Sequence, residues 1–206
     1  DNWAVGYSQE ESPASIAILN GTVGIADYAF YNCTTLQMIT IPYSVASIGH
    51  AAFYGCSSLM SVVFDDFVAE SRLTEVGEYA FYKCQNLSVI ELPDTIVKIG
   101  RSAFYRTGLA EIELPASVEE IGPYAFYRCE SLERIRFPED SQLKTIDEYA
   151  FYSCSALTSI ALPAGTQSVG VRAFGQCKAL NSVSLGGSLT SLGEYAFYSC
   201  SALSEV

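Results

Sequence analysis

The sequence predicts a right-handed solenoid in which one short unit, repeated eight times, adds successive strands to a parallel β-sheet. Three observations predict it. The dipeptide Ala-Phe recurs along the whole chain, and its phenylalanines are separated by 23, 28, 23, 22, 25, 23 and 23 residues. An aliphatic residue precedes each phenylalanine by five positions, and a leucine usually follows by six. Those phenylalanines are Phe30, Phe53, Phe81, Phe104, Phe126, Phe151, Phe174 and Phe197.

Each unit contains a segment that alternates apolar and polar residues. Leu157, Ile160 and Leu162 are followed by Pro163, and equivalent residues recur in most units. Alternation with period 2 is typical of a half-buried strand. The short interval between these segments requires each coil to return and add its strand parallel to the last.

Two other parts of the unit have weaker signals. The aliphatic residue before Ala-Phe, usually followed by glycine, predicts a second short extended segment with a φ > 0 turn at that glycine. Tyr-Ala-Phe-Tyr predicts a single helical or 3₁₀ turn on the opposite wall. The strand-closing proline marks another corner, because it has no backbone donor for a ladder.

Length changes between units predict where loops protrude. The segments 65–71 and 139–142 are inserted between the strand and the next aliphatic residue, so both loops should leave the same edge. The fourth unit is one residue short, with Thr107 and Gly108 at the position of the usual cysteine. We assign residues 1–15 to a cap or partial repeat and residues 16–206 to one solenoid.

The C-terminal unit stops at Val206, midway through its strand. Terminal repeats normally need a polar capping face, because an open strand edge offers unpaired backbone groups. We therefore expect the chain to belong to a longer protein or to associate end to end, with Ser201 to Val206 the least protected segment.

Composition limits the partners. Half of the residues are hydrophobic and 17% are charged, which requires a large buried core. A net charge of −12 argues against nucleic acid and anionic membrane surfaces as partners. Polar residues interrupt every apolar run well before the roughly 20 residues of a spanning helix, so membrane insertion is not expected.

The pattern Ile-Gly-x-Tyr-Ala-Phe-Tyr-x-Cys-x-x-Leu-x-x-Ile-x-Leu-Pro, present at 76–93 with valine leading and at 146–163 with aspartate for glycine, resembles the BspA-like leucine-rich repeats of bacterial surface proteins. The resemblance covers residues 16–206. It implies a leucine-rich-repeat solenoid, with the parallel sheet on its concave face, and an extracellular or cell-surface location. Some such proteins are adhesins, and the pattern brings no catalytic residues, because its positions are core and corner positions.

Seven cysteines allow three interpretations, namely disulfides, a metal site or a nucleophile. All occupy one repeat position, so their sulfurs should stack along the core as small buried hydrophobes. An odd count fits pairing poorly, and a line of thiols does not provide the converging ligands of a zinc site. We therefore expect reduced, buried thiols and no cofactor or metal. They are Cys33, Cys56, Cys84, Cys129, Cys154, Cys177 and Cys200.

Catalysis is not expected. His50 is the only histidine, and it occupies a variable, solvated position away from the inward cysteines, so no base lies beside a nucleophile. Asp65, Asp66 and Glu70 form the best acidic group for a cation, but they lack the oxygen spacing of known calcium loops. The tyrosines that flank Ala-Phe in nearly every unit fit a stacking ladder better than a site for one ligand.

Function is expected where equivalent positions differ between repeats. The outward strand residues change from mildly apolar, with Met38 and Met60, through a charged stretch, to small residues such as Ser159 and Ser182. The candidate ligand-binding residues are Val63, Val89, Glu91, Glu111, Glu113, Arg134 and Arg136.

Glu111 should neighbour Arg134 on the adjacent strand, and Glu113 should pair with Arg136 near the centre of the exposed sheet. These charges fit a face that recognises a protein or glycan, such as a host extracellular matrix or surface protein. They equally fit charge pairing on a solvated sheet, worth roughly 0.2–1 kcal/mol per pair. A structural spacer or self-assembling stalk is the alternative function.

Overall fold

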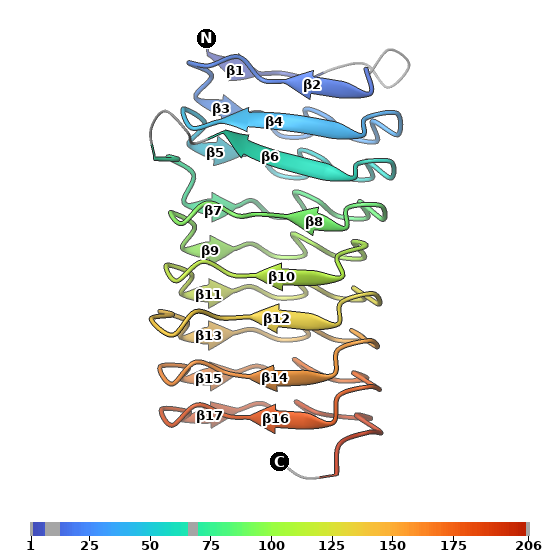
Figure 1. Cartoon of the computed structure of the whole chain (residues 1–206), viewed down its shortest axis with the longest axis vertical. Coiled ribbons are helices and arrows are strands. Elements are labelled where there is room, and N and C mark those ends of the chain that lie inside the picture. The colour runs from blue at the N-terminus through green and yellow to red at the C-terminus, as the bar shows by residue number, and fades with distance from the viewer. Residues whose placement is uncertain (1, 7–12, 66–69, 205–206) are drawn as a thin grey trace.

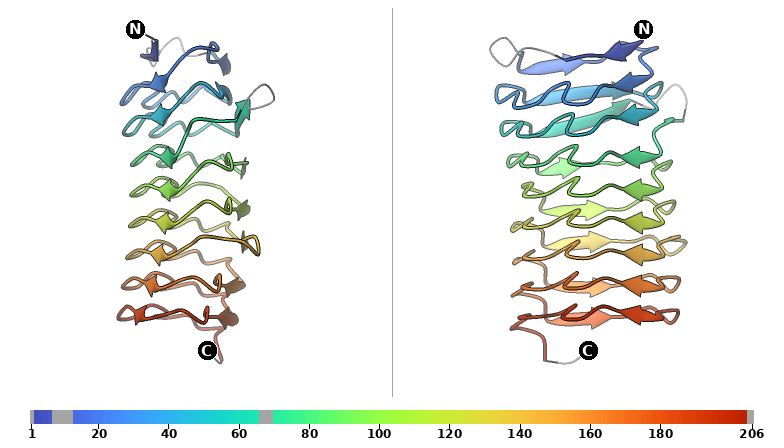
Figure 2. Two further views of the ribbon diagram at one scale, coloured as in Figure 1. Left: turned by 90° about the vertical axis from the view of Figure 1, so that its left-hand side faces the viewer. Right: turned by 180° about the vertical axis from the view of Figure 1, so that it is seen from behind.

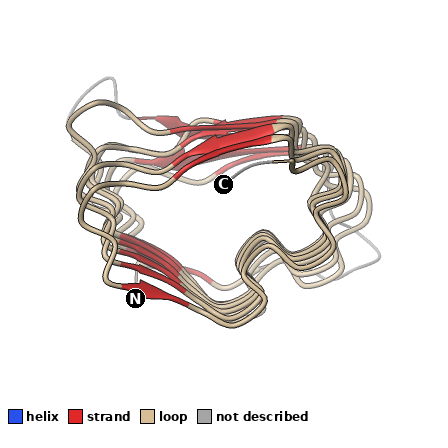
Figure 3. Ribbon diagram, turned by 90° about the horizontal axis from the view of Figure 1, so that it is seen from below, coloured by secondary structure: helices blue, strands red, loops and turns tan. Residues whose placement is uncertain are grey.

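The protein is a column of stacked coils, seen here in a computed structural model that describes residues 2–6, 13–65 and 70–204. Each coil has one strand in a front sheet, one short strand in a back sheet, and a wall built of turns (Figures 1 and 3). All strand pairs are parallel, as the period of the sequence predicts. The predicted solenoid of parallel strands is therefore confirmed, and the two ends of the chain lie at opposite ends of the column (Figure 2).

The front sheet contains the strands expected from the alternating segments. Their outward residues are exposed and their central residue faces the core, as in Glu111–Glu113 around buried Ile112. The sheet has three separate ladders, β2-β4-β6-β8, β10-β12 and β14-β16. The strands are β2 (Ser15–Ala17), β4 (Met38–Pro42), β6 (Ser61–Asp65), β8 (Val89–Ile90), β10 (Glu111–Glu113), β12 (Arg134–Arg136), β14 (Ser159–Ala161) and β16 (Ser182–Ser184).

The back sheet is formed by the second extended segment of each coil. Its ladder runs unbroken from β7 to β17, and β1, β3 and β5 form a separate group near the N-terminus. β1, which belongs to the segment 1–15, pairs with β3 of the first complete coil. The strands are β1 (Trp3–Ala4), β3 (Gly24–Ile25), β5 (Ser47–Ile48), β7 (Glu75–Val76), β9 (Lys98–Ile99), β11 (Glu120–Ile121), β13 (Thr145–Ile146), β15 (Ser168–Val169) and β17 (Ser191–Leu192).

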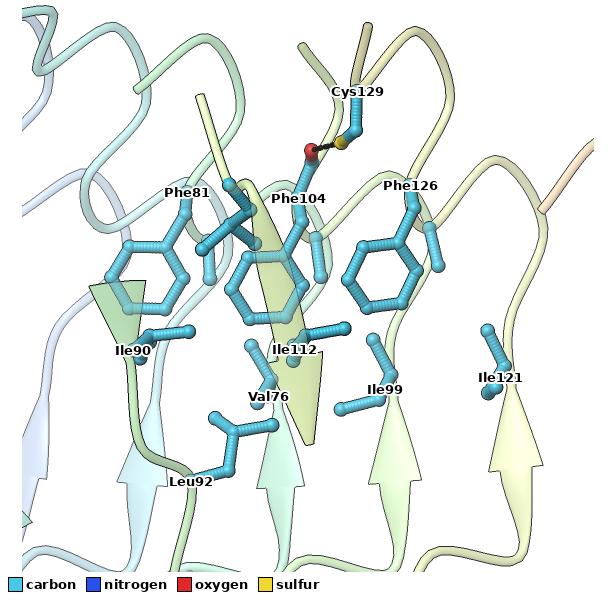
Figure 4. Close-up of a cluster of buried hydrophobic side chains, with 14 of the residues drawn as sticks. Val76, Phe81, Ile90, Leu92, Ile99, Phe104, Ile112, Ile121, Phe126 and Cys129 are labelled. Atoms are coloured by element: carbon cyan, nitrogen blue, oxygen red, sulfur yellow. Dashed lines mark hydrogen bonds between the residues drawn. The ribbon is translucent and has the colours of Figure 1, made fainter. Parts of the chain in front are cut away.

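A stack of phenylalanine rings fills the core. Phe81, Phe104 and Phe126 are fully buried, with centroids 5.4 and 5.1 Å apart and nearly parallel rings. Aliphatic residues from both sheets point at this stack, among them Ile90 and Ile99 (Figure 4). Because each coil buries its apolar face only against its neighbours, the stack is one of the contacts that hold the coils together.

The turn wall consists of residues 26–33 and the equivalent segment of every later coil. The helical or 3₁₀ turn predicted for it is wrong, because no described residue is helical. Three consecutive turns are present instead, closed by Ala29 N to Ala26 O, Tyr31 N to Tyr28 O and Cys33 N to Phe30 O.

The intervening amides of the turn wall bond to the next coil. Tyr28, Phe30 and Asn32 donate to the carbonyls of His50, Ala52 and Tyr54 at 2.7–2.9 Å. Every backbone amide from 28 to 33 therefore has a hydrogen-bond partner. The wall is hydrogen-bonded from coil to coil, as neighbouring strands are in a sheet.

This geometry places two residues of each coil in the left-handed region. They lie two positions before and two after the phenylalanine, and the non-glycine members have φ between 52° and 62°. Such residues cost about 1 kcal/mol or more each. The coil-to-coil hydrogen bonds offset that cost, since each contributes about 1 kcal/mol.

The recurring glycines have a different role from the one predicted. Gly122 and its equivalents are not among the residues with positive φ. A Cβ built on Gly122 would lie 2.8 Å from the carbonyl oxygen of Ile99 in the preceding coil, and one on Gly77 would lie 2.3 Å from that of Ile48. At Gly77 and Gly122 the glycine therefore permits a close approach of backbones, whereas Ala26 and Asp147 occupy the position in two other coils.

All seven cysteines are free and buried, as expected. Most thiols donate a hydrogen bond to the phenylalanine carbonyl of the preceding coil, and Cys129 Sγ lies 3.0 Å from Phe104 O (Figure 4). Burial raises the pKa of the Cys129 thiol to about 11. Thr107 replaces a cysteine, and its hydroxyl donates to the carbonyl of Phe104 in its own coil.

Candidate functional site

The outward residues of the front sheet carry the differences between coils. Two positions per strand face solvent, and among the described strands charge appears at both only on β10 and β12. β8 adds exposed Val89 and is followed by exposed Glu91. The flanking strands present uncharged side chains at these positions, such as Met38 on β4 and Ser182 on β16. The predicted charged stretch therefore lies in three successive coils.

The strand register agrees with the prediction, but the ion pairing differs. Glu111 faces Arg134 and Glu113 faces Arg136 on the paired strands. Arg136 Nη2 nevertheless lies 3.3 Å from Glu111 Oε2, and Arg134 Nη1 lies 3.9 Å from the same oxygen.

The predicted pair between Glu113 and Arg136 is therefore wrong. Both arginine side chains turn to one carboxylate, and Arg136 reaches it diagonally across the strands. Glu113 makes no ion pair with any described residue, and it lines the hollow beside the strand. All three charged side chains of the cluster are more than half exposed, so each contact contributes roughly 0.2–1 kcal/mol.

A hollow of about 590 Å³ adjoins this cluster. We call it the front-sheet groove. Buried leucines, prolines and an alanine supply its apolar walls, and three carboxylates stand at its rim. Its lining residues are Ile90, Glu91, Leu92, Asp94, Glu113, Leu114, Pro115, Ala116 and Pro138.

Two smaller hollows continue the groove across the sheet. One of about 170 Å³ is lined by Val89, Glu91, Glu111, Glu113 and Arg136 together with the two central isoleucines. The other, of about 200 Å³, extends to β6 and includes Val63 and Phe64. Six of the seven predicted site residues therefore line connected hollows, and Arg134 joins them through Glu111.

The groove lies over a break in the front sheet. No ladder joins β8 to β10, and in the described parts of the chain no backbone hydrogen bond connects residues 88–93 with 110–115. The one-residue deletion at Thr107 and Gly108 directly precedes β10. A second break in the front sheet separates β12 from β14, where no residue is deleted.

Sequence reasoning missed several residues of the groove. Leu92, Pro115 and Ala116 are wall residues at strand ends, and Pro138 comes from the coil that carries the insertion 139–142. Asp94 follows the strand-closing proline of its coil.

The other candidates for chemistry are not assembled into a site. His50 lies between the rings of Tyr28 and Tyr79, at centroid distances of 5.4 and 5.2 Å, and its Nδ1 is 3.8 Å from Glu78. The imidazole is partly exposed, whereas the thiols are buried in the core. Among the described residues, no three metal-ligating side chains converge. Of the predicted acidic loop 65–71, residues 66–69 lie outside the described residues, as do 205 and 206 at the C-terminus.

The tyrosines of the turn wall form a ladder, as the sequence predicts. Tyr54, Tyr82 and Tyr105 stack with centroids 4.5 and 4.4 Å apart. Burial is the main cause that raises the pKa of Tyr82 to about 12. The faces of the rings are covered by their neighbours, so only edges and hydroxyl groups reach the surface.

The described residues include no helix long and apolar enough to cross a membrane.

Comparison with known proteins agrees with this architecture. The leucine-rich repeat protein of T. pallidum shares 27% identity over 94% of this chain and 79% of its own, with a TM-score of 0.63. A leucine-rich cell surface protein from Faecalibacterium prausnitzii shares 28% identity over 94% and 66%, with a TM-score of 0.53. A leucine-rich repeat protein from Eubacterium ventriosum shares 25% identity over 93% and 60%, with a TM-score of 0.66.

The chain thus spans 60–79% of the length of these three structures. No curated protein matches it. The model of the BspA type leucine rich repeat region matches residues 7–71 and 63–155, with six copies of the repeat. That match covers more than half of the sequence, and the chain belongs to the BspA-type leucine-rich repeat family.

Proposed function

We propose that the chain is a non-catalytic binding module of a cell-surface or secreted protein, and that the front-sheet groove contacts a protein or glycan outside the cell. The observation that carries this proposal is the groove of about 590 Å³, with its rim of carboxylates, at the coils where repeats differ most. A surface that is only solvated needs neither the break in the sheet nor the apolar walls beneath it. The relative from F. prausnitzii is a cell surface protein, which supports the same location for this chain.

Adhesion is the form of binding that this geometry fits best. The groove is shallow and open along the sheet, so it suits an extended part of a large partner better than a small enclosed ligand. Host extracellular matrix or surface proteins are partners of this kind.

A panel of purified extracellular matrix proteins and immobilised glycans tests the proposal. The intact chain is passed over each, and binding is measured by surface plasmon resonance. The variant Ala116→Trp places a large side chain in the groove, and Gly187→Ala serves as the control, because nothing lies within 4 Å of its Cβ position. We expect at least one partner to be bound by the wild type and the control and lost in Ala116→Trp.

A structural stalk is the second candidate, favoured by the unbroken ladder of phenylalanines from Phe30 to Phe197. In a stalk the repeats set only length, and end-to-end association would extend it. Binding that is unaffected by Ala116→Trp, or absent across the whole panel, would support the stalk and contradict the groove.

A further inference from the structure

The charges of the groove are not balanced among themselves. The two arginines of β12 share Glu111, which neutralises one of their two positive charges. Glu91, Asp94 and Glu113 line the groove and have no ion-pair partner among the described residues. Together with Glu111 these make four carboxylates against two arginines, so the surroundings of the groove keep two excess negative charges, on a chain of net charge −12.

The positions of two carboxylates are particularly informative. Glu91 and Glu113 occupy equivalent positions in adjacent coils, and both line the large hollow and its smaller neighbour. The two strands are neighbours in the stack, and like charges at facing positions of neighbouring strands repel. A cation placed between them removes that repulsion and gains two charge-assisted hydrogen bonds.

The surroundings favour a peptide over other cations. In the described structure no three metal-ligating side chains converge, so a metal ion lacks a complete ligand set. No aromatic side chain lines the large hollow, so a sugar has no ring face on which to stack. The apolar walls from Leu92, Leu114 and Pro115 instead fit the aliphatic stem of an arginine or lysine and small apolar side chains beside it.

We propose that the occupant of the front-sheet groove is an extended basic segment of a protein, with an arginine or lysine held between Glu91 and Glu113 and small apolar residues against Leu92, Leu114 and Pro115. This inference rests on the proposed function, since it specifies the partner of the same groove. Asp94 is the third carboxylate within the groove and faces the following basic residue of such a segment.

Fluorescence anisotropy with synthetic peptides tests the inference. The probes are a fluorescein-labelled peptide in which arginine and valine alternate, and the same peptide with citrulline for each arginine. The variants are Glu91→Gln/Glu113→Gln and, as a matched control, Glu75→Gln/Glu194→Gln, which makes the same change in net charge at exposed positions outside the groove.

The wild type should bind the arginine peptide more tightly than the citrulline peptide. The groove variant should lose about fivefold to tenfold in affinity for the arginine peptide and lose its preference over citrulline. The control variant should keep both, because exposed charges beyond a Debye length are screened by salt.

The failures are distinguishable. Equal binding of the arginine and citrulline peptides, with both lost in Ala116→Trp, would overturn the basic partner but leave the groove as the contact surface. Equal losses in the groove variant and the control would show that only the net charge of the chain attracts the peptide, which also overturns the inference. Binding of both peptides that survives Ala116→Trp would contradict the groove itself, and with it the proposed function.

Discussion

The turn wall and the front sheet are made by the same repeats, but they differ in how regularly their residues and hydrogen bonds recur from coil to coil. In the turn wall nearly every coil has the same residues, and each amide from 28 to 33 is bonded either within the coil or to the next. The front sheet has three separate ladders and outward residues that change from coil to coil. We infer that the turn wall and core hold the coils in register, so the front sheet is free to break and to vary. Three changes test this contrast.

Alkaline pH should have the largest effect, because burial raises the pKa of several thiols along the core at once. Burial raises the pKa of Cys129 from 9.0 to about 11. Between these values the unfolded chain releases the proton and the folded chain keeps it. Stability is therefore fully present below pH 9 and is lost as the pH rises through 11, by about 3 kcal/mol for this thiol alone.

Urea denaturation under reducing conditions at pH 8, 9, 10 and 11 measures this loss. The variant Cys129→Ser is the control, because its hydroxyl does not ionise in this range and can still donate to Phe104 O. Its stability should fall less steeply than that of the wild type. A wild-type stability that stays constant from pH 9 to 11 would contradict the buried thiol ladder.

A close contact between coils should have the next largest effect. Gly122→Ala places a methyl group 2.8 Å from the carbonyl oxygen of Ile99, which is backbone and cannot turn away. We expect a loss of about 1–3 kcal/mol in the free energy of unfolding. Gly187→Ala, with open space around its Cβ position, should leave stability unchanged or slightly raised. Equal effects of the two substitutions would show that coil spacing does not require glycine.

The ion pairs of the front sheet should have the smallest effect. Arg136→Gln removes the 3.3 Å contact with Glu111, and because both side chains are exposed we expect a loss below about 0.5 kcal/mol. Double-mutant cycles give a finer test. Glu111 and Arg136 should show a small coupling energy, and Glu113 and Arg136 none. The reverse result would show that Arg136 forms its ion pair with Glu113, the residue directly opposite it on β10.

The sequence predicted the features that depend on repetition. The recurring Ala-Phe placed the core, and the alternation around residues such as Ile112 and Ile160 placed the front strands and their register. The single repeat position of the cysteines predicted their burial without bridges. In each case many coils impose the same requirement, so the signal is repeated.

Features fixed by contacts between coils were harder to predict. Tyr28 has a positive φ and its amide bonds to the next coil, and tyrosine does not signal this by itself. The role of Gly122 differs from the prediction because a glycine needed for close approach looks the same in sequence as one needed for φ > 0. The reach of Arg136 to Glu111 depends on side-chain conformation, which strand register does not determine.

The hydrogen bonds between coils also determine how the column responds to force. They run from each coil to the next, so tension between the two ends pulls directly on them, one interface at a time. A coil adds about 5 Å to the height of the stack. Once released, its 23 residues extend to about 80 Å. We therefore expect the protein to lengthen in discrete steps under load, with each detached coil relieving the tension on those still folded.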